Sequence, residues 1–507
     1  MTPANRVIVN TAILYGRMVL TVGVSLYSTR LILDALGSTD YGIFELVGGI
    51  IAVLAFLKNT MATSTQRFLS FYQGKKDLRG QKSVFANSLA MHIVVGIVIV
   101  IFLAFLESYL FENFLNIANG RIYAAKIVYR TMLASLLFSM INVPFMGSLV
   151  AHENLLFVAV INIFEALSKL GIAFVLILID EDKLIIYGYL MAALAFVTLM
   201  LYMAFCFKKY DECSLQGTKI DKKQIIQLSS FAGWNLFGAL CGMGRTQGLA
   251  VLLNIFFGTV INAAYGIANQ LASQMNFLSA TMLRALNPQI MKSEGFDDRE
   301  RMLRLSMIAS KFGFFLVAVI AVPAIFEMSH ILKFWLKDIP NYTTIFAQLI
   351  LTSIMLNQLT IGLQSALQAT GKIKLYQTLV GGVILMTLPL AYLFLKIGLP
   401  PYYVFISYLI LELIGVVLRI LIAKKIANLS ITLYYKRVFH GLVIPLISSL
   451  LCCYVITRYL TMDFRFLVTG GVSAAMFAVT IYAFGLYVDE KKLCLQFLHS
   501  LMKKIRK

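Results

Sequence analysis

The sequence has few charged residues and little room for a water-soluble domain. Only 13% of its 507 residues are charged, whereas 60% are hydrophobic, and the mean hydropathy is +0.83. A soluble globular chain carries about 25% charged residues, so this composition excludes a soluble protein. The stretches between the apolar segments are short, which argues against a separate catalytic domain. The composition predicts a polytopic membrane protein.

Several motifs of catalytic and metal chemistry are also missing. Gly371-Lys372 lacks the spacing of a phosphate-binding loop and is followed by isoleucine, while His152-Glu153 lacks the second histidine of a zinc helix. The six cysteines show no paired spacing typical of zinc or of a disulfide framework. We therefore expect no enzymatic activity, no cofactor and no metal. Transport energy would have to come from an H⁺ or Na⁺ gradient, the membrane potential or the gradient of the substrate.

What the sequence does contain is a series of long apolar runs. A membrane-spanning helix needs about 20 apolar residues, and windows of that length predict about fourteen spans. In the first half of the chain these are 7–33, 41–63, 84–106, 123–150, 155–179 and 184–207. The second half holds 228–257, 261–287, 305–330, 344–368, 375–396 and 402–423, followed by 438–458 and 466–487. An even count predicts both chain ends on the same side.

Lysine and arginine are distributed unevenly between the two sides of the predicted membrane. They accumulate in alternate connections, within 67–82, 208–223, 292–304, 372–374, 424–437 and 491–507. The opposite connections carry few: Arg121, Lys183, Lys333, Lys337, Arg458 and Arg465. Because lysine and arginine are enriched in cytoplasmic loops, this asymmetry predicts that both termini are cytoplasmic. It also explains most of the formal net charge of +20 without invoking nucleic acid.

A short pattern recurs in the two halves of the chain. Leu36-Gly37 corresponds to Phe257-Gly258, and residues 41–43 correspond to 265–267. An even number of spans separates the copies, so both run in the same direction, which predicts two parallel-repeat six-helix lobes around a central cavity. We expect the following organisation: an N-terminal lobe at 1–207, a cytoplasmic connector at 208–224, a second lobe at 225–430, an appended helix pair at 431–490, and a basic amphipathic tail at 491–507.

Cations inside the spans are the candidate binding residues. A charged side chain at the bilayer centre costs about 2.5–3.5 kcal/mol, so it needs water or a partner. Arg17 and Arg245 each lie well inside the first span of a lobe, and arginine offers a permanent charge and a planar fork for phosphate oxygens. We interpret them as the centre of a cationic cavity that binds substrate. Second-rank members are Arg30, Arg130, Arg284 and Lys126.

Two alternatives apply to these cations. They could instead be structural ion pairs with the membrane carboxylates of Glu45, Glu165 or Glu412. Other cations near helix ends, namely Lys58, Lys396 and Arg419, are expected to extend toward the interface. Glu45 and Glu165 are in addition the candidates for ion coupling, because a carboxyl in a low-dielectric site can exchange protons near neutral pH.

The chain resembles the bacterial polysaccharide flippases of the multidrug/oligosaccharidyl-lipid/polysaccharide exporter superfamily, the Wzx-like or O-antigen flippases. The likeness covers nearly the whole chain, and its most characteristic stretches are Ala62–Phe71, Val143–Glu153, Ser230–Gly238, Asn287–Ser293 and Gln368–Gln377. None of them is a catalytic signature, so the resemblance identifies a family better than a substrate.

The resemblance implies a flippase that moves a polyprenyl-pyrophosphate-linked oligosaccharide from the cytoplasmic to the periplasmic leaflet by alternating access. It implies a monomer in the bacterial inner membrane, in contact with membrane lipids and with polysaccharide polymerase and glycosyltransferases as partners, for lipopolysaccharide or capsule synthesis. Three alternatives stay open: an ion-coupled multidrug or metabolite exporter of the same superfamily, a peptidoglycan-precursor flippase, and a non-transporting scaffold for glycosyltransferases.

Overall fold

The computed structural model describes residues 3–52, 55–115, 117–214, 220–336, 338–462, 464–488 and 490–491. Within these ranges every regular element is a helix, which confirms the all-α prediction. Eleven helices are long and apolar enough to cross a membrane, or twelve if the bent pair α11 and α12 forms one span. The chain is therefore a multi-pass membrane protein, and the predicted number of about fourteen spans is approximate. The centre of the connector, 215–219, and nearly all of the tail, 492–507, lie outside the described residues.

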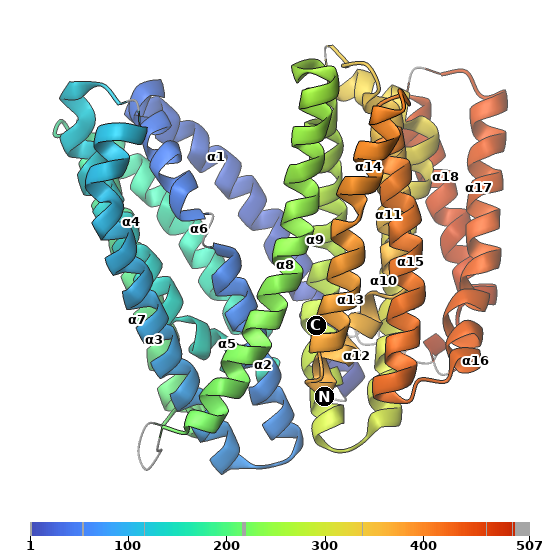
Figure 1. Ribbon diagram of the computed structural model, residues 1–507, viewed down its shortest axis with the longest axis horizontal. Coiled ribbons are helices and arrows are strands. Elements are labelled where there is room, and N and C mark those ends of the chain that lie inside the picture. Colours follow the sequence, from blue (N-terminus) through green and yellow to red (C-terminus); the bar gives the residue numbers. More distant parts are fainter. Residues whose placement is uncertain are drawn as a thin grey trace, which may run out of the picture. The chain divides into compact units, whose positions relative to one another are not determined.

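The chain divides into two compact units, and the change from one to the other falls inside α8, between Leu236 and Phe237. We call residues 9–236 the N-unit and residues from 237 onward, with which the first eight residues are grouped, the C-unit. Figure 1 shows the helices of each unit. Those that begin before the connector are α1 (Pro3–Ala52), α2 (Ala55–Gly74), α3 (Leu78–Tyr109), η1 (Leu110–Phe114), η2 (Asn119–Arg121), α4 (Ile122–Ile141), α5 (Val143–Ala151), α6 (Leu155–Ile177), α7 (Lys183–Lys209) and η3 (Asp211–Cys213).

The remaining helices begin with α8, which contributes to both units. They are α8 (Lys222–Phe257), α9 (Thr259–Gly295), α10 (Arg299–Trp335), α11 (Thr343–Gln358), α12 (Ile361–Thr370), α13 (Lys374–Leu385), α14 (Thr387–Lys396), α15 (Tyr403–Ala427), α16 (Ile431–Tyr434), η4 (Tyr435–His440), α17 (Gly441–Tyr459), α18 (Arg465–Thr480) and η5 (Ile481–Gly485). Several predicted spans are thus made of two helices in series. The span at 344–368 is one of them, because α11 and α12 meet at an angle of 44°.

Two predicted spans differ from the structure in extent or in character. The span at 41–63 is shared between the end of α1 and the start of α2, so its predicted boundaries are wrong. The span at 261–287 lies within α9, which is a continuous helix but is not among the helices apolar enough to cross a membrane. The physical reason is that α9 carries asparagine, glutamine and serine along its length, and these lower its hydropathy without breaking the helix.

Two glycines form equivalent corners in the two halves of the chain. Gly37 interrupts α1 with φ 75° and ψ 165°, and Gly258 precedes α9 with φ 78° and ψ −167°. This positive-φ, extended-ψ region is accessible essentially only to glycine. The backbone therefore repeats where the sequence pairs Leu36-Gly37 with Phe257-Gly258, and the repeat places one corner between the first two helices of each half.

We expect Gly258→Ala to destabilise the protein by about 1–3 kcal/mol, the usual cost of a strained backbone conformation. An added Cβ at Gly258 would meet no atom within 4 Å, so the penalty would come from the backbone alone. The measurement is thermal unfolding of the purified protein in detergent. Gly266→Ala is the matched control, because Gly266 lies inside α9 and also has open space for a Cβ. Equal melting temperatures for the two variants would contradict the argument.

The appended helices α17 and α18 lie side by side and pack against α10, as Figure 1 shows for the C-unit. One ion pair joins α18 to α10, and a second joins the segment after η5 to α10. Arg465 Nε donates to Glu327 Oε1 at 2.8 Å near one end of α10, and Lys311 Nζ donates to Glu490 Oε2 at 2.6 Å toward the other. Both α10 partners are buried. The part of the chain from α18 to Glu490 is thus attached to α10 by buried charges at two levels.

In the N-unit, a cluster of charged side chains around Arg121 joins three parts of the chain. Arg121 donates from Nε to Asp40 Oδ1 at 2.8 Å and from Nη1 to Asp182 Oδ2 at 2.7 Å. Asp40 follows the Gly37 corner, and Asp182 caps the start of α7. The arginine therefore fixes the corner of α1 to the beginnings of α4 and α7.

We expect acid to weaken this cluster. Burial raises the pKa of Asp182, but hydrogen bonds from Arg121 and from the backbone amides of Ile185 and Leu184 lower it by more, so the folded-state pKa lies below the ordinary value. Such a carboxylate adds stability above its unfolded-state pKa of about 3.9, and this stability is lost as the pH falls through the folded-state pKa. Melting curves of wild type and Arg121→Met should differ most near neutral pH and converge at low pH. A difference that stayed constant with pH would contradict this.

Candidate functional site

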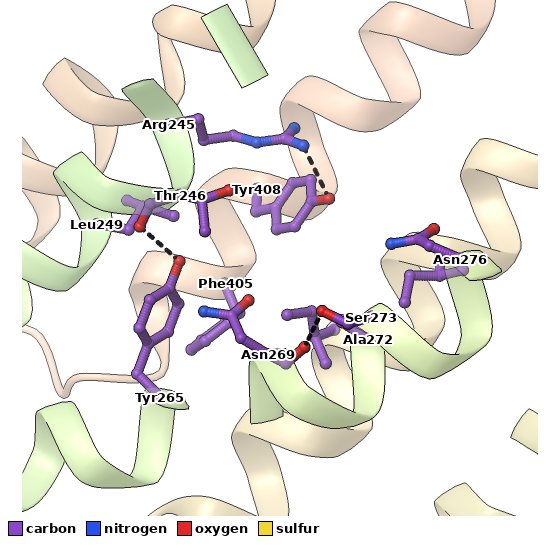
Figure 2. A pocket seen from close by; sticks show the side chains of 12 residues that line it. Arg245, Thr246, Leu249, Tyr265, Asn269, Ala272, Ser273, Asn276, Phe405 and Tyr408 are labelled. Atoms are coloured by element: carbon purple, nitrogen blue, oxygen red, sulfur yellow. Dashed lines mark hydrogen bonds between the residues drawn. The ribbon is translucent and has the colours of Figure 1, made fainter. Parts of the chain in front are cut away.

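The C-unit contains a cavity of about 180 Å³ between α8, α9, α11 and α15. Figure 2 shows the side chains around it. Its polar residues come mainly from α8 and α9, and its aromatic residues come from α9 and α15. The lining residues are Arg245, Thr246, Leu249, Tyr265, Asn269, Ala272, Ser273, Asn276, Ile350, Ile354, Phe405 and Tyr408.

Arg245 is the charged residue of this lining. Its guanidinium lies over the ring of Tyr408, 3.9 Å from the ring centroid, and Nη2 donates to the Tyr408 hydroxyl at 2.9 Å. Nη1 is 3.5 Å from Glu412 Oε2, and 15% of the side chain is exposed. Tyr408 therefore holds the guanidinium at the edge of the cavity (Figure 2). A cation fixed in this way keeps donor groups available for an anionic ligand.

The carboxylate behind Arg245 has a closer partner. Arg419 Nη1 donates to Glu412 Oε1 at 2.9 Å, and the side chains of both residues are 2% exposed. Asn357 donates to the same oxygen at 2.8 Å, and Arg419 also donates to Thr360, at the break between α11 and α12. Two arginines thus share one carboxylate, which leaves one positive charge in excess beside the cavity.

The α9 side of the cavity is neutral and polar. Tyr265 donates its hydroxyl to the carbonyl oxygen of Thr246 at 2.8 Å, and Ser273 donates to the carbonyl oxygen of Asn269 at 2.9 Å (Figure 2). Ser273 and Asn276 are exposed. The cavity therefore combines one fixed cation with amide and hydroxyl groups, and no carboxylate is among its lining residues.

The structure places the predicted cationic residues at several separate positions. Of that set, Arg245 lines the described cavity. Arg284 is exposed on α9 of the same unit, and Arg30 is exposed on α1. In the N-unit, Arg130 is exposed and donates to Glu107 at 2.8 Å, and Lys126 lies 6.0 Å from the ring centroid of Phe111.

Arg17 and the two candidate coupling carboxylates belong to the N-unit. Arg17 is half-buried on α1 and interacts electrostatically with Tyr202 of α7. Glu165 of α6 interacts with the same tyrosine and with Lys58 of α2. Glu45 is exposed and interacts with Tyr41. Arg17 in α1 and Arg245 in α8 thus each interact with a tyrosine of another helix, and the guanidinium of Arg245 lies over the tyrosine ring.

The expectation that Arg419 extends toward the interface is wrong. Arg419 is buried and pairs with Glu412, because the two residues lie seven positions apart on one face of α15. This seven-residue spacing in the sequence could have indicated the pairing of Arg419 with Glu412. The pairing of Arg245 with Tyr408, 163 residues away, had no such signal.

Neither family models nor curated proteins match this chain. Solved structures do. A MATE in complex with MaD3S aligns with a TM-score of 0.73 at 13% identity, covering 84% of this chain and 96% of the other. An outward-facing multidrug resistance MATE transporter of the MOP superfamily gives 0.70 at 13% identity, with coverage of 84% and 96%. The third is a MOP superfamily transporter from Pyrococcus furiosus, for which reverse polarity of the binding pocket suggests a different function. It aligns with a TM-score of 0.71 at 13% identity, again covering 84% of this chain and 96% of the other.

These alignments cover most of both chains, so the protein is a multi-pass membrane protein with the fold of the MATE transporters. Identity of 13% shows the fold and not the substrate. The resemblance to the polysaccharide flippase branch is not tested by these structures.

Proposed function

We propose that this protein is a transporter of the MOP superfamily that moves a polyprenyl-pyrophosphate-linked oligosaccharide across a membrane by alternating access. The observation that carries the proposal is the charge of the C-unit cavity. Arg245 lines it, and the nearby Glu412 is already paired with Arg419. Arg245 shares Glu412 with Arg419, so its positive charge is only partly compensated, and a pyrophosphate would be attracted to it whereas a cationic drug would be repelled.

The size of the cavity bears on which part of the substrate it would hold. At about 180 Å³ it is smaller than the pockets of about 300–1,000 Å³ that enclose a whole drug-sized ligand. One phosphate-sized or sugar-sized group fits this volume better than a complete lipid-linked oligosaccharide. We infer that the cavity takes the diphosphate region and that the lipid tail stays in the bilayer.

Location and partners follow from the same proposal. The protein would act in the bacterial inner membrane with both termini in the cytoplasm, as the distribution of lysine and arginine supports. It would work as a monomer beside polysaccharide polymerase and glycosyltransferases. Arg17, Arg30, Arg130, Arg284 and Lys126 would serve as further cationic contacts along the path, and Glu45 or Glu165 would couple transport to H⁺ or Na⁺.

The second candidate is export of drugs or metabolites. The fold favours it, because one of the matching structures is a multidrug resistance MATE transporter. The absence of a carboxylate among the residues that line the described cavity favours an anionic substrate instead. Deletion of the gene separates the two candidates: drug export predicts drug sensitivity with normal surface glycans.

The test is deletion in the host followed by analysis of polyprenyl-linked glycans on both faces of the membrane. We expect lipid-linked oligosaccharide to accumulate on the cytoplasmic face. Arg245→Ala should restore surface glycan at least about 100-fold less well than wild type, since it removes charge-assisted hydrogen bonds. The control is Arg458→Ala, which removes an exposed arginine at the end of α17. Normal glycan display after deletion would refute the proposal.

A further inference from the structure

The exposed face of α9 differs from a surface in contact with lipid. Between Val443 and Val455 of α17, the exposed residues are large and apolar: Val443, Ile444, Ile447, Leu450, Leu451, Tyr454 and Val455. Between Ala263 and Arg284 of α9, the exposed residues are small or polar apart from one phenylalanine: Ala263, Gly266, Gln270, Ser273, Gln274, Asn276, Phe277, Ala280 and Arg284. At 1.5 Å per residue this stripe is about 30 Å long, which equals the hydrocarbon thickness of a bilayer. Amides in contact with lipid would be left without hydrogen-bond partners, which is costly.

The polar part of this stripe continues from the cavity. Asn269, Ser273 and Asn276 line the cavity that contains Arg245, and they recur on one side of α9 at intervals of three or four residues. Figure 2 shows Asn276 on the same helix as Ser273, and among the described residues its carboxamide has no hydrogen-bond partner. Gln270 and Gln274 extend the same surface. An uncharged set of donors and acceptors therefore lies next to a fixed cation.

The chemistry of this surface suits one class of ligand. Amide groups pair with hydroxyls as both donors and acceptors, and the exposed ring of Phe277 offers a flat apolar surface of the kind that packs on the C–H face of a sugar. A cationic drug would require carboxylates, and an acyl chain would require an apolar stripe. Between Asn269 and Phe277 the helix carries no charge.

We propose that Gln270, Ser273, Gln274, Asn276 and Phe277, here called the α9 polar face, bind an uncharged sugar that adjoins the diphosphate of the substrate. This inference rests on the proposed function and adds a sugar subsite to it. The diphosphate is held at Arg245, and the first sugar lies along α9. The amides discriminate a glycan-bearing lipid from a bare lipid diphosphate.

The test uses the double variant Gln270→Met/Asn276→Leu, in which apolar side chains of similar size replace both amides. The control is Asn254→Leu, which removes an exposed amide of α8 that belongs neither to the cavity nor to the α9 polar face. Each variant is expressed in the deletion host for measurement of surface glycan. Each is also purified for binding of undecaprenyl diphosphate, which carries no sugar.

We expect the double variant to lower surface glycan at least about tenfold at unchanged protein amount, as the loss of two ordinary hydrogen bonds would. Its binding of undecaprenyl diphosphate should match that of wild type and of Asn254→Leu. Normal surface glycan in the double variant would show that the α9 polar face contacts lipid. An equal loss of undecaprenyl diphosphate binding would show that the α9 polar face does not recognise the sugar. Either result overturns the inference and leaves the proposed function standing. If wild type does not bind undecaprenyl diphosphate and deletion leaves glycans normal, the proposed function fails and the inference falls with it.

Discussion

Replacing Arg419 with glutamine is expected to reduce transport at least about 100-fold, although Arg419 does not line the cavity. With Arg419 removed, Glu412 keeps Arg245 as its cationic partner, so the carboxylate neutralises the guanidinium that faces the ligand. Two unit charges about 4 Å apart interact by about 4 kcal/mol at an effective dielectric constant of about 20. An anionic ligand would have to compete with that interaction, and 4 kcal/mol exceeds a 100-fold change in affinity.

A second substitution tests whether charge is the cause. Adding Glu412→Gln to Arg419→Gln removes the competing carboxylate and should restore most of the transport. Adding Arg245→Gln instead should restore none. The measurement is surface glycan in the deletion host, normalised to the amount of membrane protein. If Arg419→Gln/Glu412→Gln transported no better than Arg419→Gln alone at equal protein amount, Arg419 would act through packing and not through the charge of the cavity.

Replacing Glu490 with leucine is expected to destabilise the C-unit by about 3–5 kcal/mol, the typical cost of removing one partner of a buried ion pair. The Lys311 side chain is fully buried, and its Nζ lies 2.6 Å from the Glu490 carboxylate. The ring of Tyr487 also contacts this ammonium, with its centroid 4.7 Å away, but it cannot replace a carboxylate. Thermal unfolding of the purified protein in detergent should show a large drop in melting temperature.

The double variant Lys311→Met/Glu490→Leu separates the loss of charge pairing from the loss of packing. Because it leaves no buried charge behind, it should melt closer to wild type than Glu490→Leu does. The argument would be refuted by a double variant at least as unstable as the single one. The expected pattern would also establish that α10 and the segment after α18 are joined by electrostatics, since the two residues are 179 positions apart.

The features that could be predicted from the sequence were those that depend on residues close together in the chain. Apolar runs of bilayer length predicted the membrane class, and the repeated Leu36-Gly37 and Phe257-Gly258 predicted that the two halves of the chain repeat; the structure then places a positive-φ glycine at both positions. Arg245 was recognisable because a charge inside an apolar run needs a wet or paired environment. Its role as a cavity residue was inferable in the same way.

Other features depended on which helices pack together. The spacing of Glu412 and Arg419 on α15 could indicate their pairing, but the sequence could not show that Arg245 also approaches Glu412, because that distance depends on the positions of α8 and α15. It could not reveal that α9 exposes amides and α17 exposes leucine and isoleucine, since both helices contain polar and apolar residues.

The chain alone specified that it enters a membrane and where its spans approximately lie, since hydropathy and span length are properties of neighbouring residues. The partner of each buried charge, the position of the cavity and the helix face that remains polar were decided by packing. These properties depend on distances between residues up to 179 positions apart, and such distances exist only once the helices are assembled.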